Sequence, residues 1–276
     1  MSFRMSGVMG WPVGHSRSPA LHGHWLARHG IAGTYVPLPV QPEHLEQALR
    51  ALPVLGFAGC NLTVPHKEAA FRIVDHVDRA AARLRAVNTV IVRPDGTLEG
   101  RNTDGEGFLK HLEASAPAWR PDRPVLVLGA GGAARAVVGT LADAGVPEIR
   151  IANRTDARAA SLAEEFGTPL RPWPWAKRED GLTGCGLVVN TTQLGMVGWP
   201  ELELALDRLP GDGVVYDIVY TPLETPLLAE ARQRGLTTVD GLGMLLHQAR
   251  AGFAAWFGVD PTVDEALRQA VLGSTP

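Results

Sequence analysis

Three clusters of polar residues in the first 105 residues could do acid–base chemistry, and each lies near the end of an expected strand. The clusters are His15–Pro19, Gly59–Lys67, and the paired segments Val87–Thr89 and Gly100–Gly105. Asn61 and Thr63 alternate along a strand and so share one face. A lysine held near a carboxylate in an enclosed site can protonate a developing alkoxide or accept its proton. Lys67 could act in this way, with Asp104 as its partner.

Each cluster also has a purely structural interpretation. Ser18 before Pro19 is a suitable N-cap for the helix expected after it. A lone lysine is usually a solvated surface residue, and Asp104 can begin a turn or cap a helix. Taken together, these Ser, Asn, Thr, Lys and Asp residues suit a small polyhydroxylated carboxylate as the ligand. Its anionic group would fit the helix N-terminus beside Ser16 and Ser18.

A glycine-rich turn between an expected strand and an expected helix predicts a dinucleotide site. The strand is Val125–Leu128, Gly129–Ala134 reads G-x-G-x-x-A, and a run with helical spacing follows. Gly129 allows the turn, Gly131 lets the backbone approach a pyrophosphate, and Ala134 lets the helix pack closely on the strand. The helix N-terminus favours the phosphate charge. The alternative is an ordinary glycine-rich strand–helix turn.

The end of the next expected strand, Glu148–Ala152, indicates which dinucleotide binds. An NAD site would place Asp or Glu there to hold the ribose 2′-hydroxyl. This chain instead has Asn153, Arg154 and Thr155, and Arg158 follows one helical turn after Arg154. Two planar guanidinium groups can clamp a 2′-phosphate, so we predict NADP(H). The alternative is that both arginines are solvated surface charges, and the aspartate between them weighs slightly for it.

Strands and helices are expected to alternate along the whole chain. Apolar runs of strand length recur between connections rich in Gly and Pro, and most are separated by stretches with helical spacing. This alternation favours βαβ units and parallel sheets, an α/β fold. Asp95–Gly96 predicts a hairpin turn, and 173–175 is expected to be a surface loop. The expected strands are Arg4–Gly10, Thr34–Pro39, Gly56–Val64, Val87–Val92, Val125–Leu128, Glu148–Ala152, Leu187–Asn190, Val214–Ile218 and Thr237–Val239.

The composition excludes several classes of protein. The 276 residues include 26 Lys plus Arg and 29 Asp plus Glu, a net charge of −3, so the basic excess of a nucleic-acid binder is missing. No apolar run reaches the roughly 18 residues of a membrane span. No secretory signal is visible, so we expect a cytoplasmic protein without nucleic-acid or membrane partners. The two cysteines and nine histidines have no recognised ligand spacing, so no metal site is expected.

Eight segments, in the right order, resemble those of the shikimate dehydrogenase family over nearly the whole chain. Four lie in the first 105 residues: GWPVGHSRSPALH at 10–22, NLTVPHKE at 61–68, AVNT at 86–89 and GRNTDG at 100–105. Four follow: GAGGA at 129–133, NRT at 153–155, DIVY at 217–220 and DGLGMLLHQ at 240–248. Their number and order make the resemblance specific.

The resemblance implies two α/β domains, an N-terminal substrate domain and a Rossmann-type NADP-binding domain, with the active site in the cleft between them. Residues 1–105 plus 241–276 would form the substrate domain, and residues 106–240 the NADP-binding domain. The reaction would be the reversible NADPH-dependent reduction of 3-dehydroshikimate to shikimate, in the pathway to chorismate and the aromatic amino acids. The oligomeric state, monomer or homodimer, is left open by the sequence.

The resemblance also implies roles for individual residues. Lys67 and Asp104 would form the catalytic pair, with no metal. The substrate would be bound by Ser16, Ser18, Asn61, Thr63, Asn88, Tyr220 and Gln248, of which the two serines would hold its carboxylate. The cofactor would be bound by Gly129, Ala130, Gly131, Gly132, Ala133, Asn153, Arg154, Thr155 and Arg158, and Ile218 and Gly241 would lie near the nicotinamide.

The chain departs from the family pattern at two places, and three other functions compete with the leading one. Gly23 stands where the family usually has Asn, and 190–196 is a looser match, but neither involves the catalytic pair. The competing functions are a quinate/shikimate dehydrogenase that accepts NAD, an enzyme for an amino-substituted shikimate, and a non-catalytic NADP(H)-binding sensor or scaffold. A decayed enzyme should have lost Lys67 or Asp104, and both are present.

Overall fold

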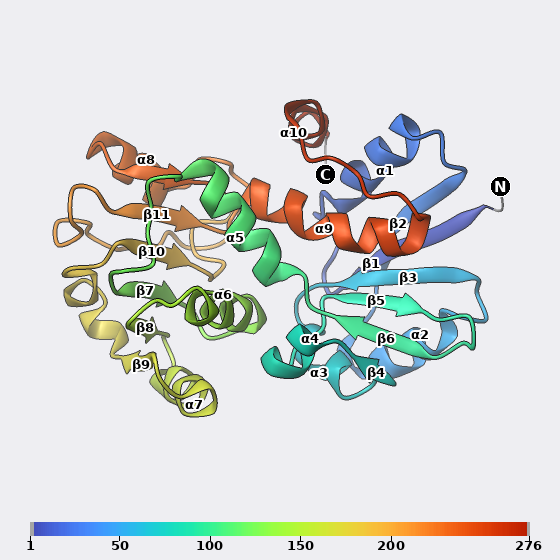
Figure 1. Ribbon diagram of the computed structural model, residues 1–276, viewed down its shortest axis with the longest axis horizontal. Helices are drawn as coiled ribbons and strands as arrows, with labels where there is room; N and C mark the ends of the chain where they lie inside the picture. Colours follow the sequence, from blue (N-terminus) through green and yellow to red (C-terminus); the bar gives the residue numbers. More distant parts are fainter. Residues whose placement is uncertain (1–2, 275–276) are drawn as a thin grey trace. The chain divides into compact units, whose positions relative to one another are not determined.

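Residues 3–274 are described by a computed structural model, in which the chain divides into two units (Figure 1). The first unit consists of Met1–Gly107 and Leu245–Pro276, and the second of Phe108–Met244. Residues 1, 2, 275 and 276, which the expected substrate domain includes, lie outside the described residues. Each unit contains a six-stranded sheet with helices packed against it, so the expected α/β class is confirmed.

The sheet of the first unit mixes parallel and antiparallel strands. Its spatial order is β2 (Gly33–Pro39), β1 (Arg4–Gly10), β3 (Phe57–Leu62), β5 (Thr89–Val92), β6 (Leu98–Arg101) and β4 (His76–Val77). β5 runs antiparallel to both β3 and β6, so the carboxyl ends of those two strands lie beside the amino end of β5. The predicted hairpin turn at 95–96 is confirmed, since it joins β5 to β6.

Helices cover both faces of this sheet. One face packs against α2 (Leu45–Ala51), α3 (Lys67–Phe71) and α4 (Arg79–Leu84) through an aliphatic core that includes Leu49 and Leu98. The other face packs against α1 (Ser18–Arg28) and α9 (Gly241–Phe257), with the aromatic rings of Trp25, Tyr35 and Trp256 buried between them. The last helix, α10 (Glu265–Leu272), packs against α1.

The start of α1 corrects one prediction. Its N-cap is Arg17 rather than Ser18, which is already the first residue of the helix. Arg17 has helical backbone angles, so the helical turn starts one residue earlier than the sequence indicated. The hydroxyl oxygen of Ser16 accepts the N–H of Ser18 at 3.3 Å. The two serines are therefore joined at this helix end.

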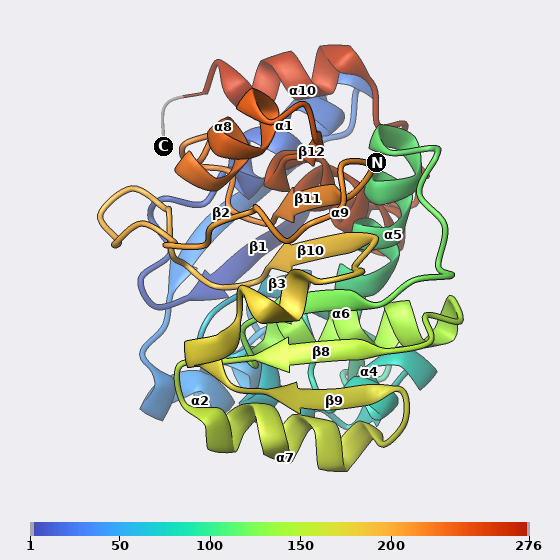
Figure 2. The same ribbon diagram turned by 90° about the vertical axis from the view of Figure 1, so that its left-hand side faces the viewer.

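The second unit contains an all-parallel sheet. Its spatial order is β12 (Thr237–Val239), β11 (Val214–Asp217), β10 (Leu187–Asn190), β7 (Val125–Leu128), β8 (Ile149–Ala152) and β9 (Leu170–Trp173). Figure 2 shows β12, β11, β10, β8 and β9 from top to bottom in this sequence. The chain order reverses between β7 and β10, and ligands of such sheets bind at this switch point, beyond the carboxyl ends of the strands.

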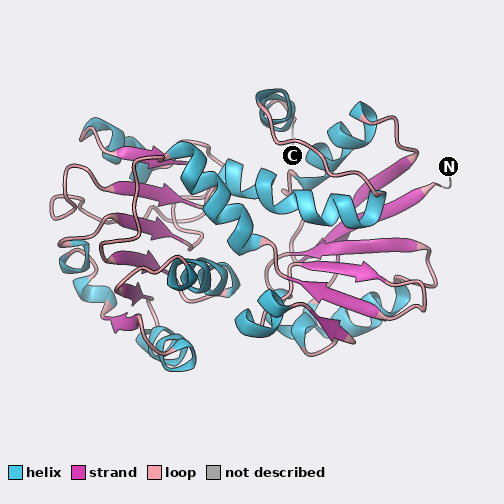
Figure 3. Ribbon diagram, in the orientation of Figure 1, coloured by secondary structure: helices cyan, strands magenta, loops and turns pink. Residues whose placement is uncertain are grey.

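Side chains along these parallel strands alternate between two cores, as the period of a strand requires. Val125 and Tyr216 pack against α5 (Asp104–Ser115), α6 (Gly132–Asp143) and α7 (Asp156–Phe166). Leu126 and Val215 pack on the other face, against α8 (Pro226–Gln233) and nearby loops. Figure 3 shows helices on both sides of these six strands. No helix within residues 3–274 has the length and hydrophobicity that a membrane span requires.

The edge strand β9 corrects the expected loop at 173–175. Trp173 is the last residue of this strand, whereas Pro174 and Trp175 lie in the connection to β10, as expected. Pro172 lies within this strand. An edge strand tolerates proline, because its outward-facing backbone has no partner strand to which an N–H must donate.

Candidate active site

The first unit holds Lys67 and Asp104 as a direct ion pair. Lys67 begins α3, and Asp104 begins α5. The Nζ of Lys67 lies 2.5 Å from Oδ2 of Asp104, and the two side chains are only 16% and 7% exposed. The carbonyl oxygen of Lys67 also accepts the N–H of Val87, which ties α3 to the segment before β5. The carboxylate thus holds the side chain of Lys67 in one position.

Asn88, directly before β5, joins this pair to its neighbours. Its Nδ2 donates to Oδ1 of Asp104 at 2.9 Å and lies 3.2 Å from Oε1 of Gln248 on α9. Its Oδ1 accepts the N–H of Thr103 at 2.9 Å and the hydroxyl of Thr89 at 3.0 Å. All five residues are buried. The carboxylate of Asp104 is therefore held through both of its oxygens.

Asn61, at the end of β3, extends the hydrogen-bond network towards α1. Its Oδ1 accepts the hydroxyl of Tyr35 at 2.7 Å, and its Nδ2 donates to the carbonyl oxygen of Asn88 at 3.1 Å. Burial raises the pKa of Tyr35 well above its usual value, while a hydrogen bond with Ser18 acts in the opposite direction. The phenol therefore stays protonated and donates. Buried polar groups thus form a continuous chain from Ser18 to Asp104.

The three other expected substrate residues lie near the ends of helices or strands. Ser16 is half-buried in the loop before α1, and Thr63 is half-buried just beyond β3. The methyl group of Thr63 lies so close to Gly10 that a Cβ at position 10 would be 2.4 Å from it. Tyr220 belongs to the second unit, where it follows β11 and is half-buried.

The glycine-rich turn of the second unit has the backbone geometry that a pyrophosphate requires. Gly129 has a φ of +111°, and a Cβ there would lie 2.5 Å from Oγ1 of Thr191, so only glycine fits. Gly131 is the N-cap of α6, and no side chain caps this helix. A Cβ on Gly131 would meet no atom within 4 Å, so open space lies in front of the backbone. The first N–H groups of α6 can therefore bind an anion.

The end of β8 provides cationic groups for a second phosphate. The side chains of Arg154 and Arg158 are exposed, and neither guanidinium group has an ion pair or hydrogen bond within residues 3–274. Asn153 donates to the carbonyl oxygen of Thr155 at 3.0 Å and so shapes the turn between β8 and α7. The carboxylate of Asp156 accepts the backbone N–H of Trp175 at 3.2 Å, which gives this intervening acid a partner of its own. The unpartnered guanidinium groups fit a ribose 2′-phosphate.

Ile218 and Gly241, the two residues expected near a nicotinamide, lie together. A Cβ on Gly241 would be 2.1 Å from the carbonyl oxygen of Ile218 and 2.6 Å from that of Val219, so the two backbones are in direct contact. Only a residue without a side chain allows this approach. The residues present therefore fit NADP(H) at its pyrophosphate, its 2′-phosphate and the segment expected for its nicotinamide.

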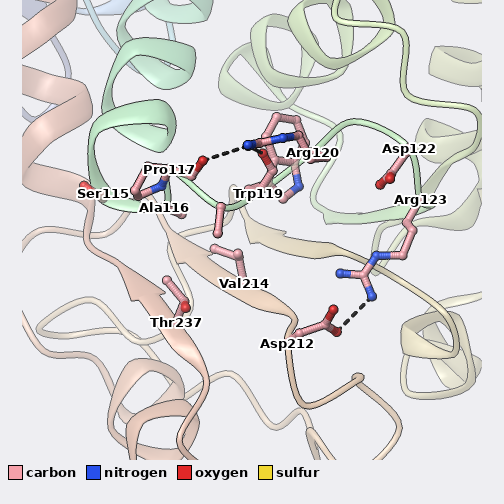
Figure 4. Close-up of a pocket in the computed structure, with 11 residues that line it drawn as sticks. Ser115, Ala116, Pro117, Trp119, Arg120, Asp122, Arg123, Asp212, Val214 and Thr237 are labelled. Carbon is pink, nitrogen blue, oxygen red and sulfur yellow. Dashed lines mark hydrogen bonds and ion pairs between the residues drawn. The ribbon is translucent and has the colours of Figure 1, made fainter.

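A cavity of about 450 Å³ lies at the amino ends of β11 and β12, whereas the expected cofactor residues follow the carboxyl ends of the strands (Figure 4). Its lining includes Val214 and Thr237, the first residues of β11 and β12, and Trp119 from the loop after α5. In the figure Arg123 points to Asp212, with which it forms an ion pair of 2.9 Å. None of the expected cofactor residues lines this cavity, so it is separate from the candidate site.

The sequence did not assign Tyr35, Thr89 or Thr103 to the site, although all three belong to the network. Thr89 and Thr103 stand next to Asn88 and Asp104, and that adjacency was an available signal. Tyr35 has no such neighbour in the sequence. Tyr35 lies on β2 and Asn61 on β3, with β1 between these strands in the sheet. The two side chains come together only because the strands pair in this order, which the sequence does not show.

Three family models match the chain. The shikimate dehydrogenase substrate binding domain matches residues 8–90, shikimate / quinate 5-dehydrogenase matches 116–194, and the shikimate 5′-dehydrogenase C-terminal domain matches 241–272. Among curated proteins, the shikimate dehydrogenase (NADP(+)) of Paramagnetospirillum magneticum is 61% identical over 270 residues, which is 98% of each chain.

Solved structures of similar chains differ in their ligands. Shikimate 5-dehydrogenase from Thermus thermophilus, in complex with NADP(H) and shikimate, is 40% identical with a TM-score of 0.86, and the match covers 98% of each chain. Quinate dehydrogenase from Corynebacterium glutamicum, in complex with NAD, is 32% identical with a TM-score of 0.91, and the match covers 99% of this chain and 100% of that one. Backbone similarity alone therefore does not separate the two substrates or the two cofactors.

Proposed function

Since this chain belongs to the shikimate dehydrogenase family, we propose that it catalyses the reversible NADPH-dependent reduction of 3-dehydroshikimate to shikimate. The observation that carries the proposal is the ion pair of Lys67 and Asp104, 2.5 Å apart and largely buried. Full-length relatives named for this activity support the same conclusion. The enzyme is thus an NADP-dependent oxidoreductase that acts on a CH–OH group.

The residues of the first unit would provide the acid–base chemistry. When bound, NADPH supplies the hydride. As the substrate carbonyl is reduced, its oxygen gains negative charge, and the ammonium group of Lys67 stabilises that charge and donates a proton to the oxygen. Asp104 keeps Lys67 oriented through their ion pair. In the reverse direction, Lys67 accepts the hydroxyl proton of shikimate.

Further residues of both units would bind the substrate. We assign the carboxylate of the substrate to Ser16 and Ser18, because an anion is favoured at the N-terminus of α1. The ring hydroxyl groups would meet amide, hydroxyl and phenol groups, which can both donate and accept hydrogen bonds. These groups belong to Asn61, Thr63, Asn88, Tyr220 and Gln248.

The second unit would hold the cofactor. Backbone N–H groups of 129–133 would bind the pyrophosphate, and Arg154 and Arg158, with Asn153 and Thr155, would bind the 2′-phosphate. Ile218 and Gly241 would lie along the nicotinamide. In this assignment residues 1–105 plus 241–276 form the substrate domain, and residues 106–240 form the cofactor domain.

The proposed setting is biosynthetic. The enzyme would work in the cytoplasm, on the pathway to chorismate and the aromatic amino acids, as a monomer or a homodimer. Its partners would be small molecules rather than nucleic acid or membrane.

A second function, oxidation of quinate with NAD, has support from the high TM-score of the quinate dehydrogenase structure. The exposed guanidinium groups of Arg154 and Arg158 oppose it, because an NAD site favours an acidic residue at this strand end. The choice between the two functions depends on the side chains after β8 and not on the fold.

Steady-state oxidation of shikimate and of quinate, each with NADP and with NAD, tests the proposal. Absorbance at 340 nm should rise for shikimate with NADP and remain near background for the other three combinations. Activity with quinate or NAD would move the protein to the second function. If folded protein binds NADPH but is inactive in all four assays, a non-catalytic NADP(H) sensor replaces both functions.

A further inference from the structure

A buried acidic residue that the proposed mechanism does not use lies at the carboxyl end of β11. Asp217 is fully buried, and no cation within residues 3–274 pairs with it. Its Oδ1 accepts the N–H of Val219 at 3.0 Å and Nδ2 of Asn190 at 2.9 Å, and its Oδ2 accepts the hydroxyl of Thr225 at 2.7 Å. Burial raises the pKa of Asp217 to about 6 in spite of these three bonds.

Asn190 ends the neighbouring strand β10 and is the register partner of Asp217. Its Nδ2 also donates to the carbonyl oxygen of Leu194 at 3.1 Å. Its Oδ1 accepts both the N–H of Thr192, at 3.0 Å, and the hydroxyl of the same residue, at 2.7 Å. The loop after β10 is therefore attached at two points to the cluster that Asp217 anchors.

The segments fixed in this way touch the residues assigned to the cofactor. Thr191, in the loop after β10, donates its hydroxyl to the carbonyl oxygen of Leu128 at 2.6 Å and lies against Gly129. Ile218, directly after Asp217, donates its N–H to the carbonyl oxygen of Asn190 at 3.1 Å and lies against Gly241. The cluster thus connects the pyrophosphate turn with the segment expected at the nicotinamide.

We propose that Asp217 is a positioning residue of the cofactor site, which acts through Asn190 and Thr225 to fix the loops at 191–194 and 218–219. An apolar residue would fill the same space without the cost of burying a carboxylate, but it could not accept hydrogen bonds from the end of β10, from the loop after β11 and from the N-cap of α8 at once. The inference rests on the proposed function only in taking the dinucleotide to be NADP(H).

The test compares Asp217→Ala with Asp217→Asn. The alanine variant leaves three buried donors without an acceptor, whereas asparagine keeps an oxygen for Val219 and Asn190. The matched control is Asp212→Ala, which removes an exposed acid from the loop before the same strand. The measurements are the Kd of NADPH by fluorescence titration, the KM and kcat for NADP and shikimate, and thermal unfolding.

We expect the Kd and KM of Asp217→Ala for the cofactor to rise about tenfold or more, since displaced binding groups are costly. Asp217→Asn should restore most of this loss, and Asp212→Ala should match the wild type. Folded Asp217→Ala with wild-type cofactor constants would overturn the inference. If that variant does not fold, Thr225→Val and Thr225→Ser decide, and only the valine variant should weaken NADPH binding. Because NADPH binding is measured directly, a wild type inactive on shikimate would refute the proposed function without deciding this inference.

Discussion

The two units prepare their functional groups in opposite ways. In the first unit, Lys67, Asn88 and Asp104 are held by one another and are mostly out of water. In the second, the guanidinium groups of Arg154 and Arg158 are exposed and have no hydrogen-bond or ion-pair partner among the residues described. Side chains of the protein itself thus hold the groups proposed for acid–base chemistry, whereas the groups proposed to bind phosphate would gain their partners from the ligand.

The chemistry of each site explains this difference. A proton donor must keep one geometry, because a displacement of even 1 Å can cost a hundredfold in rate, roughly. A phosphate-binding arginine needs only to be charged and within reach, and arginine stays charged at any ordinary pH. A hydrogen-bonded network is therefore useful around Lys67 and unnecessary around Arg154.

The largest effect is expected from a substitution that removes the proposed proton donor. Lys67→Ala should lower kcat by about 10²–10⁴-fold, because a positioned general acid contributes this much. The Kd of NADPH should hardly change, since Lys67 belongs to the first unit and the phosphate-binding residues to the second. Steady-state kinetics and NADPH titration check both expectations. The control is Lys177→Ala, which removes an exposed lysine, and turnover near the wild-type level in Lys67→Ala would exclude the assigned role.

The next largest effect is expected at Asp217, which is buried although it belongs to the same unit as the exposed Arg154 and Arg158. Burial raises its pKa from 3.8 to about 6 in the folded state. The folded protein therefore binds a proton more tightly than the unfolded chain, and the stability contributed by this protonation is lost as the pH rises through 6. Asparagine does not titrate in this pH range, so the stability of Asp217→Asn does not include this loss.

The free energy of unfolding of Asp217→Asn, relative to the wild type, should accordingly increase by about 2 kcal/mol between pH 4 and pH 7. Urea unfolding of both proteins at several pH values measures this difference, and groups common to both cancel. A relative stability that stays constant with pH, or that falls as the pH rises, would contradict the shift.

The smallest effect concerns the exposed guanidinium groups. Arg154→Ala should raise the KM for NADP about tenfold, the cost of a charge-assisted contact with phosphate. The KM for shikimate should remain unchanged. The control is Arg171→Ala on the edge strand β9, because Arg171 is 67% exposed and lies 3.6 Å from its acidic partner. Equal increases in both KM values for Arg154→Ala would mean that Arg154 is structural.

Much of the fold could be predicted from local patterns. The strand at 125–128, the G-x-G-x-x-A turn and the helix after it follow one another in the sequence, so hydrophobic period and glycine spacing were sufficient. The hairpin at 95–96 was likewise local. Trp173 was expected in a loop but ends an edge strand, and the sequence does not reveal whether a strand lies at the edge of a sheet. The N-cap of α1 differed by one residue, a common uncertainty at helix ends.

The side-chain networks depend on pairings between distant segments. Asp104 could be suspected from its neighbours, but its bond to Lys67 needs β3, β5 and β6 side by side. Tyr35 and Asp217 carry no sequence pattern that separates them from core residues. Their roles depend on register, Tyr35 through Asn61 and Asp217 through Asn190. The arginines proposed to bind phosphate could be suggested from the sequence alone, because an exposed group at a strand end needs no tertiary partner.

A double-variant cycle tests most directly whether the first unit supplies the acid–base chemistry and the second unit the phosphate contact. The kcat/KM for NADP is measured in the wild type, Lys67→Ala, Arg154→Ala and the double variant. If one unit supplies the acid–base chemistry and the other the phosphate contact, the two losses should add in free energy to within about 0.5 kcal/mol. A double variant that is no worse than Lys67→Ala alone, or far worse than the sum, would show that the two groups act as one site.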